Sequence, residues 1–342
     1  MLLCACAAAS GAAPTPALDP ALPAPAATAT LPPAELAPAP TAKTAGANLP
    51  GRLLFVQSGN LWLWQGDSGR QITSTGDAFQ PAWSPDGSRI AFVQRETSAS
   101  DLMLLPAEGG VPTRLTENAP DGSVYSYDRI YTSRWAFYPA WAPSGDTLVF
   151  ASQFGPPGGS PAAEYRLSLF TLELGARQPL QRYGASDGHV GRSAYLPDGS
   201  AIVFAFEPLG EAPPTLYRYQ TELDDAQPLA GAPPQSYDPA VSADGRWLAF
   251  AMRDGASTDI YAMPPTGGAP VRLTNLGAAR APAFSPDGAH LAFLALSPGS
   301  ISFDVWVVDL QAAPGGALSA GQPRQITTDM RLDADSGIAW GR

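Results

Sequence analysis

Cysteine is nearly absent from this chain, and histidine is almost as rare. Both cysteines, Cys4 and Cys6, lie at the extreme N-terminus, so residues 7–342 can form neither a disulfide nor a thiolate metal site. The two histidines, His189 and His290, give no cluster of nitrogen ligands. We therefore expect no metal and no other cofactor.

Charge is scarce too, and basic charge is the scarcer sign. Only 15% of the 342 residues are charged, and 20 Lys and Arg face 31 Asp and Glu, for a formal net charge of -11. Because nucleic-acid binders present a basic face, nucleic acid is excluded as a partner class. Long hydrophobic runs are also missing. After residue 6, no stretch of the sequence reaches the ~20 apolar residues that a membrane span needs.

The N-terminus carries the signs of export. Leu3-Cys4-Ala5-Cys6 resembles the lipobox of bacterial lipoproteins, which ends in Leu-x-Ala-Cys or Leu-x-Gly-Cys. Residues 1–6 are too short for a complete signal of ~7–15 apolar residues, so we interpret them as its remnant and predict lipidation of Cys6. The alternative is that both cysteines are chance residues in an Ala-rich stretch.

Residues 7–50 are almost wholly Ala, Pro, Thr and Leu. Such a segment cannot bury enough apolar surface to fold, and its prolines favour extended polyproline II. We predict a disordered Ala/Pro-rich tether with a reach of order 100 Å. The expected location is the periplasmic or extracellular surface of a bacterial cell envelope, with the membrane reached only through a lipid anchor at Cys6.

One short sequence motif recurs five times in the rest of the chain. The Pro present in four of the five copies fixes φ, and the Gly present in all five tolerates positive φ, so each copy predicts a tight turn. An apolar strand-like run follows each copy, and recurrence at this spacing indicates a repeat architecture. The copies are AWSPDG (82–87), AWAPSG (140–145), AYLPDG (194–199), AVSADG (240–245) and AFSPDG (283–288).

Each repeat reads as four short strands. In the first full copy these are expected at 80–84, 89–94, 101–105 and 111–115, and no segment shows sustained helical periodicity. Four-stranded units repeated in this way form propeller blades, which leave few exposed sheet edges. We call the residue at the equivalent position of each predicted first strand its anchor. The anchors are Trp83, Trp141, Tyr195, Val241, Phe284 and Trp340.

The two chain ends are complementary. The C-terminus stops after a first strand at 338–342, whereas residues 52–57, 60–64 and 70–73 supply a second, third and fourth strand without a first. We therefore predict an all-β, six-bladed β-propeller over 51–342, closed by the C-terminal strand joining the N-terminal blade.

The motif from Pro81 to Gly87, followed by Ile90-Ala-Phe92, resembles the repeat of TolB-type propellers. This repeat also occurs in relatives of prolyl oligopeptidase. The resemblance covers residues 51–342 and implies the six-bladed fold. TolB carries an α/β domain before its propeller, where this sequence has the tether. The peptidases carry a hydrolase domain that this sequence lacks.

No catalytic set stands out. Gly184-Ala-Ser-Asp-Gly188 fits the G-x-S-x-G pattern, but Ser186 lies in a predicted loop without the strand and helix that a nucleophile elbow requires. Asp333-Ala-Asp335-Ser-Gly337 lacks the ligand spacing of a calcium loop and is interpreted as a solvated acidic loop. We therefore expect that the protein is not an enzyme.

Binding is expected on the face with the longer loops. The insertion from Glu117 to Phe137 interleaves aromatics with arginines, side chains that dominate interfaces, and should overhang the central channel. The alternative is that its aromatics only pack on their own propeller. The candidate residues are Tyr125, Tyr127, Asp128, Arg129, Tyr131, Arg134, Trp135, Tyr138, His189, Arg192, Asp238 and Arg280.

The sequence thus predicts a monomeric, non-catalytic binding or scaffold module of the cell envelope, with a protein, peptide or glycan as partner. Three alternatives stay open: an enzyme or metal-dependent site at the channel mouth, an accessory propeller for a separate peptidase, and a purely structural envelope protein.

Overall fold

The computed structural model describes residues 49–119, 123, 126–153, 166–184, 188–297, 299–312 and 318–342. These belong to one compact unit, Ala39–Arg342. Residues 7–48 of the predicted tether, the lipidation site Cys6, Tyr125 and Ser186 lie outside the described residues. Leu49, which the sequence assigned to the tether, is instead buried in the apolar core.

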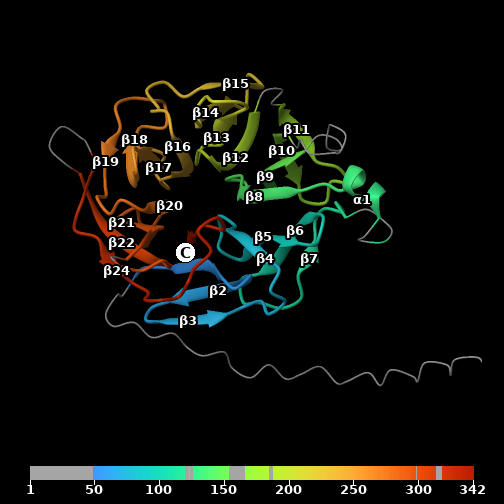
Figure 1. The fold of residues 1–342 in the computed structure, drawn as a ribbon, viewed down its shortest axis with the longest axis horizontal. Coiled ribbons are helices and arrows are strands. Elements are labelled where there is room, and N and C mark those ends of the chain that lie inside the picture. Colours follow the sequence, from blue (N-terminus) through green and yellow to red (C-terminus); the bar gives the residue numbers. More distant parts are fainter. Residues whose placement is uncertain are drawn as a thin grey trace, which may run out of the picture. The chain divides into compact units, whose positions relative to one another are not determined.

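Six small antiparallel sheets are arranged in a ring, as predicted (Figure 1). Apart from β25, blades 1 to 3 come from residues 52–183. Blade 1 contains β25 (Ala339–Gly341), β1 (Arg52–Gln57), β2 (Asn60–Gln65) and β3 (Ser68–Gln71); blade 2 contains β4 (Ala78–Trp83), β5 (Arg89–Arg95), β6 (Ser100–Pro106) and β7 (Thr113–Arg114); blade 3 contains β8 (Ala136–Trp141), β9 (Thr147–Gln153), β10 (Leu167–Glu173) and β11 (Leu180–Tyr183).

Blades 4 to 6 repeat the same order. Blade 4 contains β12 (Gly188–Tyr195), β13 (Ala201–Pro208), β14 (Thr215–Gln220) and β15 (Asp225–Pro228); blade 5 contains β16 (Ser236–Val241), β17 (Leu248–Asp254), β18 (Ser257–Met263) and β19 (Val271–Arg272); blade 6 contains β20 (Ala279–Phe284), β21 (His290–Leu296), β22 (Phe303–Ala312), β23 (Leu318–Ala320) and β24 (Arg324–Gln325).

The ring closes where the sequence predicted. β25 pairs antiparallel with β1, with Leu53 opposite Trp340, so both chain ends build blade 1. The indole Nε1 of Trp340 also donates a hydrogen bond of 2.7 Å to the carbonyl oxygen of Pro50. The prediction of closure by the C-terminal strand is confirmed.

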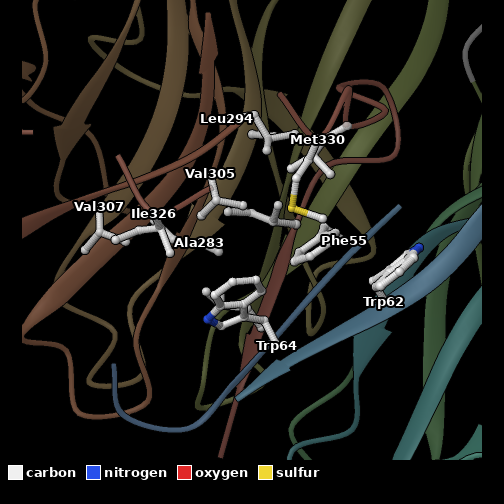
Figure 2. Close-up of a cluster of buried hydrophobic side chains, with 14 of the residues drawn as sticks. Phe55, Trp62, Trp64, Ala283, Leu294, Val305, Val307, Ile326 and Met330 are labelled. Atoms are coloured by element: carbon white, nitrogen blue, oxygen red, sulfur yellow. The ribbon is translucent and has the colours of Figure 1, made fainter. Parts of the chain in front are cut away.

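The apolar core lies between neighbouring blades. Figure 2 shows the cluster between blades 1 and 6, where Phe55 and Trp64 meet Val305, Ile326 and Met330. Phe55 and Val305 are fully buried. Each such side chain contributes about 1.5–3 kcal/mol by leaving water, so blade-to-blade packing is the main source of stability.

The repeated turns are structural, as the sequence indicated. In the first copy the hydroxyl of Ser84 donates to Asp86 at 2.6 Å and accepts from the backbone N–H of Arg89 at 2.9 Å. Gly87 takes a φ of +71°. These contacts use the repeated side chains within the turn, which removes them as candidates for a functional site.

A second repeated device was not anticipated from the sequence. Three blades begin the third strand with a buried aspartate that accepts a hydrogen bond from a threonine hydroxyl after the fourth strand. The distances are 2.8 Å for Asp101 and Thr116, 2.7 Å for Asp259 and Thr274, and 2.9 Å for Asp304 and Thr327.

One short helix, α1 (Tyr127–Thr132), interrupts the otherwise β structure at the outer rim near blade 3 (Figure 1). Within the described ranges, no helix is both long and apolar enough to cross a membrane.

Candidate functional site

In five of the six blades the innermost strand has an unusual backbone position, three residues before its anchor. Gln80, Tyr138, Asp238 and Ala281 have φ between 52° and 54° there, and Gly337 has 69°. Left-handed conformations are uncommon for residues other than glycine and cost about 1–3 kcal/mol each. The four non-glycine residues each precede a proline and lie in a break of the strand register. These bulges set the side chains that surround the channel mouth.

Two of these side chains bind the equivalent residue of the next blade. The Gln80 amide oxygen accepts from the backbone N–H of Tyr138 at 2.8 Å. A carboxylate oxygen of Asp238 accepts from the backbone N–H of Ala281 at 3.2 Å. The innermost strands of neighbouring blades are therefore joined by polar contacts as well as by the apolar core.

Asp238 is the centre of an ion-pair network at the mouth. It is 5% exposed and accepts from Arg280 Nε at 3.0 Å and from Arg192 Nε at 3.3 Å. Arg280 also pairs with Asp335 at 2.7 Å, and Arg192 Nη2 donates to the Asp335 carbonyl oxygen at 3.0 Å. Side chains from blades 4, 5 and 6 are thereby joined to the segment that leads into β25.

The network keeps its charges at neutral pH. Burial alone would raise the pKa of Asp238, but the guanidiniums of Arg280 and Arg192 outweigh it and hold this pKa below its ordinary value. Burial likewise disfavours the charged form of Arg280, yet the carboxylates of Asp238 and Asp335 raise its pKa. Two arginines and two aspartates leave the network neutral overall.

Aromatic rings support the arginines. The guanidinium of Arg192 lies 5.0 Å from the ring centre of Tyr138, and that of Arg280 lies 5.6 Å from Tyr237. Such cation–π contacts contribute about 0.5–2 kcal/mol. Burial is the main cause that raises the pKa of Tyr138, so its hydroxyl stays a neutral donor.

Glycine is required opposite Arg192. A Cβ on Gly337 would lie 2.8 Å from Arg192 Nη2, and the positive φ is a second constraint. The guanidinium can therefore cross to the segment before β25 only because this position has no side chain.

A cavity of about 360 Å³ opens beside this network. His189 and Glu207, which face each other across β12 and β13, line it, and the backbone N–H of Leu167 donates to His189 Nδ1 at 3.4 Å. Tyrosine, arginine, histidine and carboxylate groups from four blades thus surround one small space. Its lining includes Tyr138, His189, Arg192, Glu207, Tyr237, Asp238 and Arg280.

The structure brings together five of the residues that the sequence singled out: Tyr138, His189, Arg192, Asp238 and Arg280 all line this cavity. The insertion before β8 behaves differently. We expected it to overhang the channel, but Arg129 is 6% exposed, donates to Ser98 at 2.6 Å and pairs with Glu96 at 3.6 Å. A hydroxyl and a carboxylate of the β5–β6 loop therefore hold α1 at the rim.

The remaining members of that insertion are not in the described lining of this cavity. Trp135 stacks on Phe137 with centroids 5.9 Å apart, which favours the packing alternative for this residue. Arg134 lines a different cavity, between blades 2 and 3. The backbones of Tyr127, Asp128 and Tyr131 belong to α1.

Sequence reasoning missed three polar residues of the cavity or the network: Glu207, Tyr237 and Asp335. Asp335 was assigned to a solvated acidic loop, and its side chain is indeed 72% exposed, yet it pairs with Arg280. The available signal was its place two residues before Gly337, which occupies the same repeat position as Asp238.

In the described part of the chain, no three His, Cys, Asp or Glu side chains are placed to hold a metal ion. What the mouth offers is hydrogen bonding, paired charge and aromatic surface. Its geometry suits recognition of a ligand.

Comparison with known proteins supports the fold. No family model matches the chain. It is 27% identical over 214 residues to YuxL, an uncharacterized peptidase of Bacillus subtilis (strain 168). That match covers 60% of this chain and 27% of YuxL, so it spans about a quarter of that protein's length.

Solved structures give the broader likeness. TolB from Acinetobacter baumannii matches with a TM-score of 0.60 and 20% identity, over 86% of this chain and 67% of that one. A TolB-type protein from Agrobacterium tumefaciens matches at 0.57 and 15% identity, over 84% and 95%. A chain of a nidogen–laminin complex matches at 0.58 and 12% identity, over 84% and 97%. The protein therefore has the six-bladed β-propeller fold of the TolB type.

Proposed function

We propose that this chain is a non-catalytic binding module that captures a protein partner through a segment seated at the channel mouth. The observation that carries the proposal is the cavity in which Tyr138, Arg192 and Arg280 converge from three different blades. Tyr and Arg are the side chains most enriched at the energetic centres of protein interfaces.

The electrostatics favour a polar peptide segment over a simple ion. Arg192 and Arg280 are already satisfied by Asp238 and the Asp335 segment, so no net charge is left to capture an isolated anion. The cavity instead offers mixed donors and acceptors with tyrosine rings, as a backbone with side chains requires. The likeness to a chain solved in a nidogen–laminin complex is consistent with this use.

A photo-crosslinking amino acid at Glu207 tests the proposal. Glu207 lines the cavity, is exposed, and does not belong to the ion-pair network. Arg253, exposed on β17 and absent from the cavity lining, is the matched control position. In envelope extract we expect a discrete protein adduct from position 207 and none from 253. Equal or absent labelling at both positions would contradict the proposal.

Attachment to the cell envelope through a lipid on Cys6 is part of the same proposal. Mass spectrometry of the protein from its own cells should show an acylated Cys6, and Cys6→Ala should release the protein from the membrane fraction. An unmodified Cys6, or a Cys6→Ala protein that stays in that fraction, contradicts this part.

A second candidate rests on the similarity to YuxL: an accessory propeller for a separate peptidase. It predicts that the protein adduct formed at position 207 is a hydrolase, identified by mass spectrometry. A partner without a hydrolase domain rejects this candidate and leaves the binding role standing.

A further inference from the structure

A second and larger cavity, of about 650 Å³, lies between blades 2 and 3. It shares no lining residue with the channel mouth. Its walls come from the segment after β7, from β9 and β10, and from the turn before β11. The volume falls within the range of about 300–1,000 Å³ that is typical of small-ligand sites. We call it the interblade cavity.

The interblade cavity carries unpaired positive charge. Arg134 and Arg177 line it, both are exposed, and neither forms an ion pair with any acidic side chain among the described residues. A third arginine, Arg114, is already paired with Asp101 and Glu96. Glu117 is the one acidic residue of the described lining. In a chain of net charge -11, this local excess of arginine favours an acidic ligand.

A buried acceptor without a partner lies in the same lining. Gln153 is 4% exposed, its Nε2 donates to the Ser133 carbonyl oxygen at 2.7 Å, and its Oε1 has no hydrogen-bond partner. Because a carbonyl oxygen can only accept, Ser133 fixes which way the amide is turned. A buried acceptor left unpaired is costly, so this position favours a ligand with an N–H or O–H donor.

The rest of the lining is mixed: Thr116, Asn118, Ser152 and Gln178 are polar, and one side is apolar and aromatic. Phe150 and Phe170 both line the cavity, with ring centroids 6.0 Å apart, and Leu115 and Pro179 complete this side. The ligand should therefore combine negative charge, a hydrogen-bond donor and an apolar group. A peptide with acidic side chains next to an aromatic one has all three, whereas sulfate would satisfy only the arginines.

We propose that the interblade cavity binds a short acidic peptide segment. Its carboxylates pair with Arg134 and Arg177, a backbone N–H donates to Gln153 Oε1, and an apolar side chain packs against the aromatic wall. This site lies outside the channel mouth and does not depend on the function proposed for it.

Calorimetric titration of the full chain with the capped peptide acetyl-Glu-Phe-Asp-amide tests the proposal. We expect saturable binding that is at least tenfold weaker for the neutral peptide acetyl-Gln-Phe-Asn-amide. The double variant Arg134→Glu/Arg177→Glu should also bind at least tenfold more weakly, because two attractive charges become repulsive. Arg253→Glu makes the same type of change far from the cavity lining and should bind like the wild type.

A third variant separates the buried acceptor from the charges. Gln153→Met keeps an unbranched chain of similar length and should weaken binding severalfold, provided that circular dichroism shows a retained fold. Binding that the double variant leaves unchanged, or no saturable binding up to about 1 mM, would overturn the proposal. Glu207→Trp, which fills the channel mouth, should leave this titration unchanged, so the two proposed sites can fail separately.

Discussion

Arg192 Nη2 donates a 3.0 Å hydrogen bond to the carbonyl oxygen of Asp335, although 143 residues separate them in sequence. The contact joins blade 4 to the segment that leads into the closing strand. Gly337 leaves room for the guanidinium, and Asp238 holds its other side. A ring that closes through its two chain ends is thus also tied at its centre by polar side chains.

Loss of the central carboxylate should destabilise the fold. Asp238→Ala leaves Arg192 and Arg280 as neighbouring charges without their shared partner, which should lower the free energy of unfolding by about 2–4 kcal/mol. Urea denaturation measures this. Asp254→Ala, an exposed change at the end of β17, should stay within about 0.5 kcal/mol of the wild type. Equal stability of the two variants would mean that the network is not structural.

The same residue predicts the sign of a pH effect. The pKa of Asp238 is lower in the folded chain than in the unfolded one, where it is about 3.9. The folded state therefore gains stability that is fully present above about pH 4 and is lost as the pH falls through the lower, folded pKa. The melting-temperature gap between wild type and Asp238→Asn should be wide at pH 7 and should narrow progressively as the pH falls below about 4. A gap that widens in acid contradicts this assignment.

A repeated arginine–tryptophan contact between neighbouring blades predicts an energetic coupling between its two side chains. The guanidinium of Arg89 lies 4.9 Å from the ring centre of Trp141 in the next blade, and Arg89 Nη2 donates to the Gly145 carbonyl oxygen at 2.6 Å. Arg52 makes the same two contacts with Trp83 and Gly87. A double-mutant cycle of Arg89→Ala and Trp141→Leu should give a coupling energy of about 1 kcal/mol in urea unfolding. Strictly additive effects of the two substitutions on the free energy of unfolding would contradict this coupling.

Closure of the ring predicts a large effect from its last aromatic residue. Trp340→Ala removes the hydrogen bond to Pro50, the stacking on His290 at 6.3 Å and the packing against the core cluster between blades 1 and 6. We expect a loss of about 2 kcal/mol or more in the free energy of unfolding. Hydrogen exchange should show faster opening of β1 than of β17. Uniform exchange across the blades would speak against a weakened closure.

The fold was predictable because its repeated residues act locally. Pro, Asp and Gly set the turn within one stretch such as Ser84 to Arg89, and the alternation of short apolar strands needs no distant information. The closing strand followed from counting strands at the two ends. Short fourth strands such as β7 were predicted too long, since propensity does not determine where pairing with the neighbour stops.

The site was only partly predictable because its contacts join distant parts of the chain. Asp238 and Arg280 could be placed at the mouth from their repeat position, but their pairing with Asp335 depends on ring closure. The helix α1 was missed because one buried arginine, Arg129, and its partners on another loop hold it at the rim. Aromatic and arginine content alone does not distinguish such packing from a binding surface.

The central claim, that the channel mouth is where the partner binds, is tested most directly by one dissociation constant. The partner identified by crosslinking at position 207 is purified and titrated against Glu207→Trp, which fills the cavity without touching the ion pairs of Arg192 and Arg280. Arg253→Trp is the control. We predict binding at least tenfold weaker for Glu207→Trp and unchanged for Arg253→Trp. An unchanged dissociation constant for Glu207→Trp would contradict the claim.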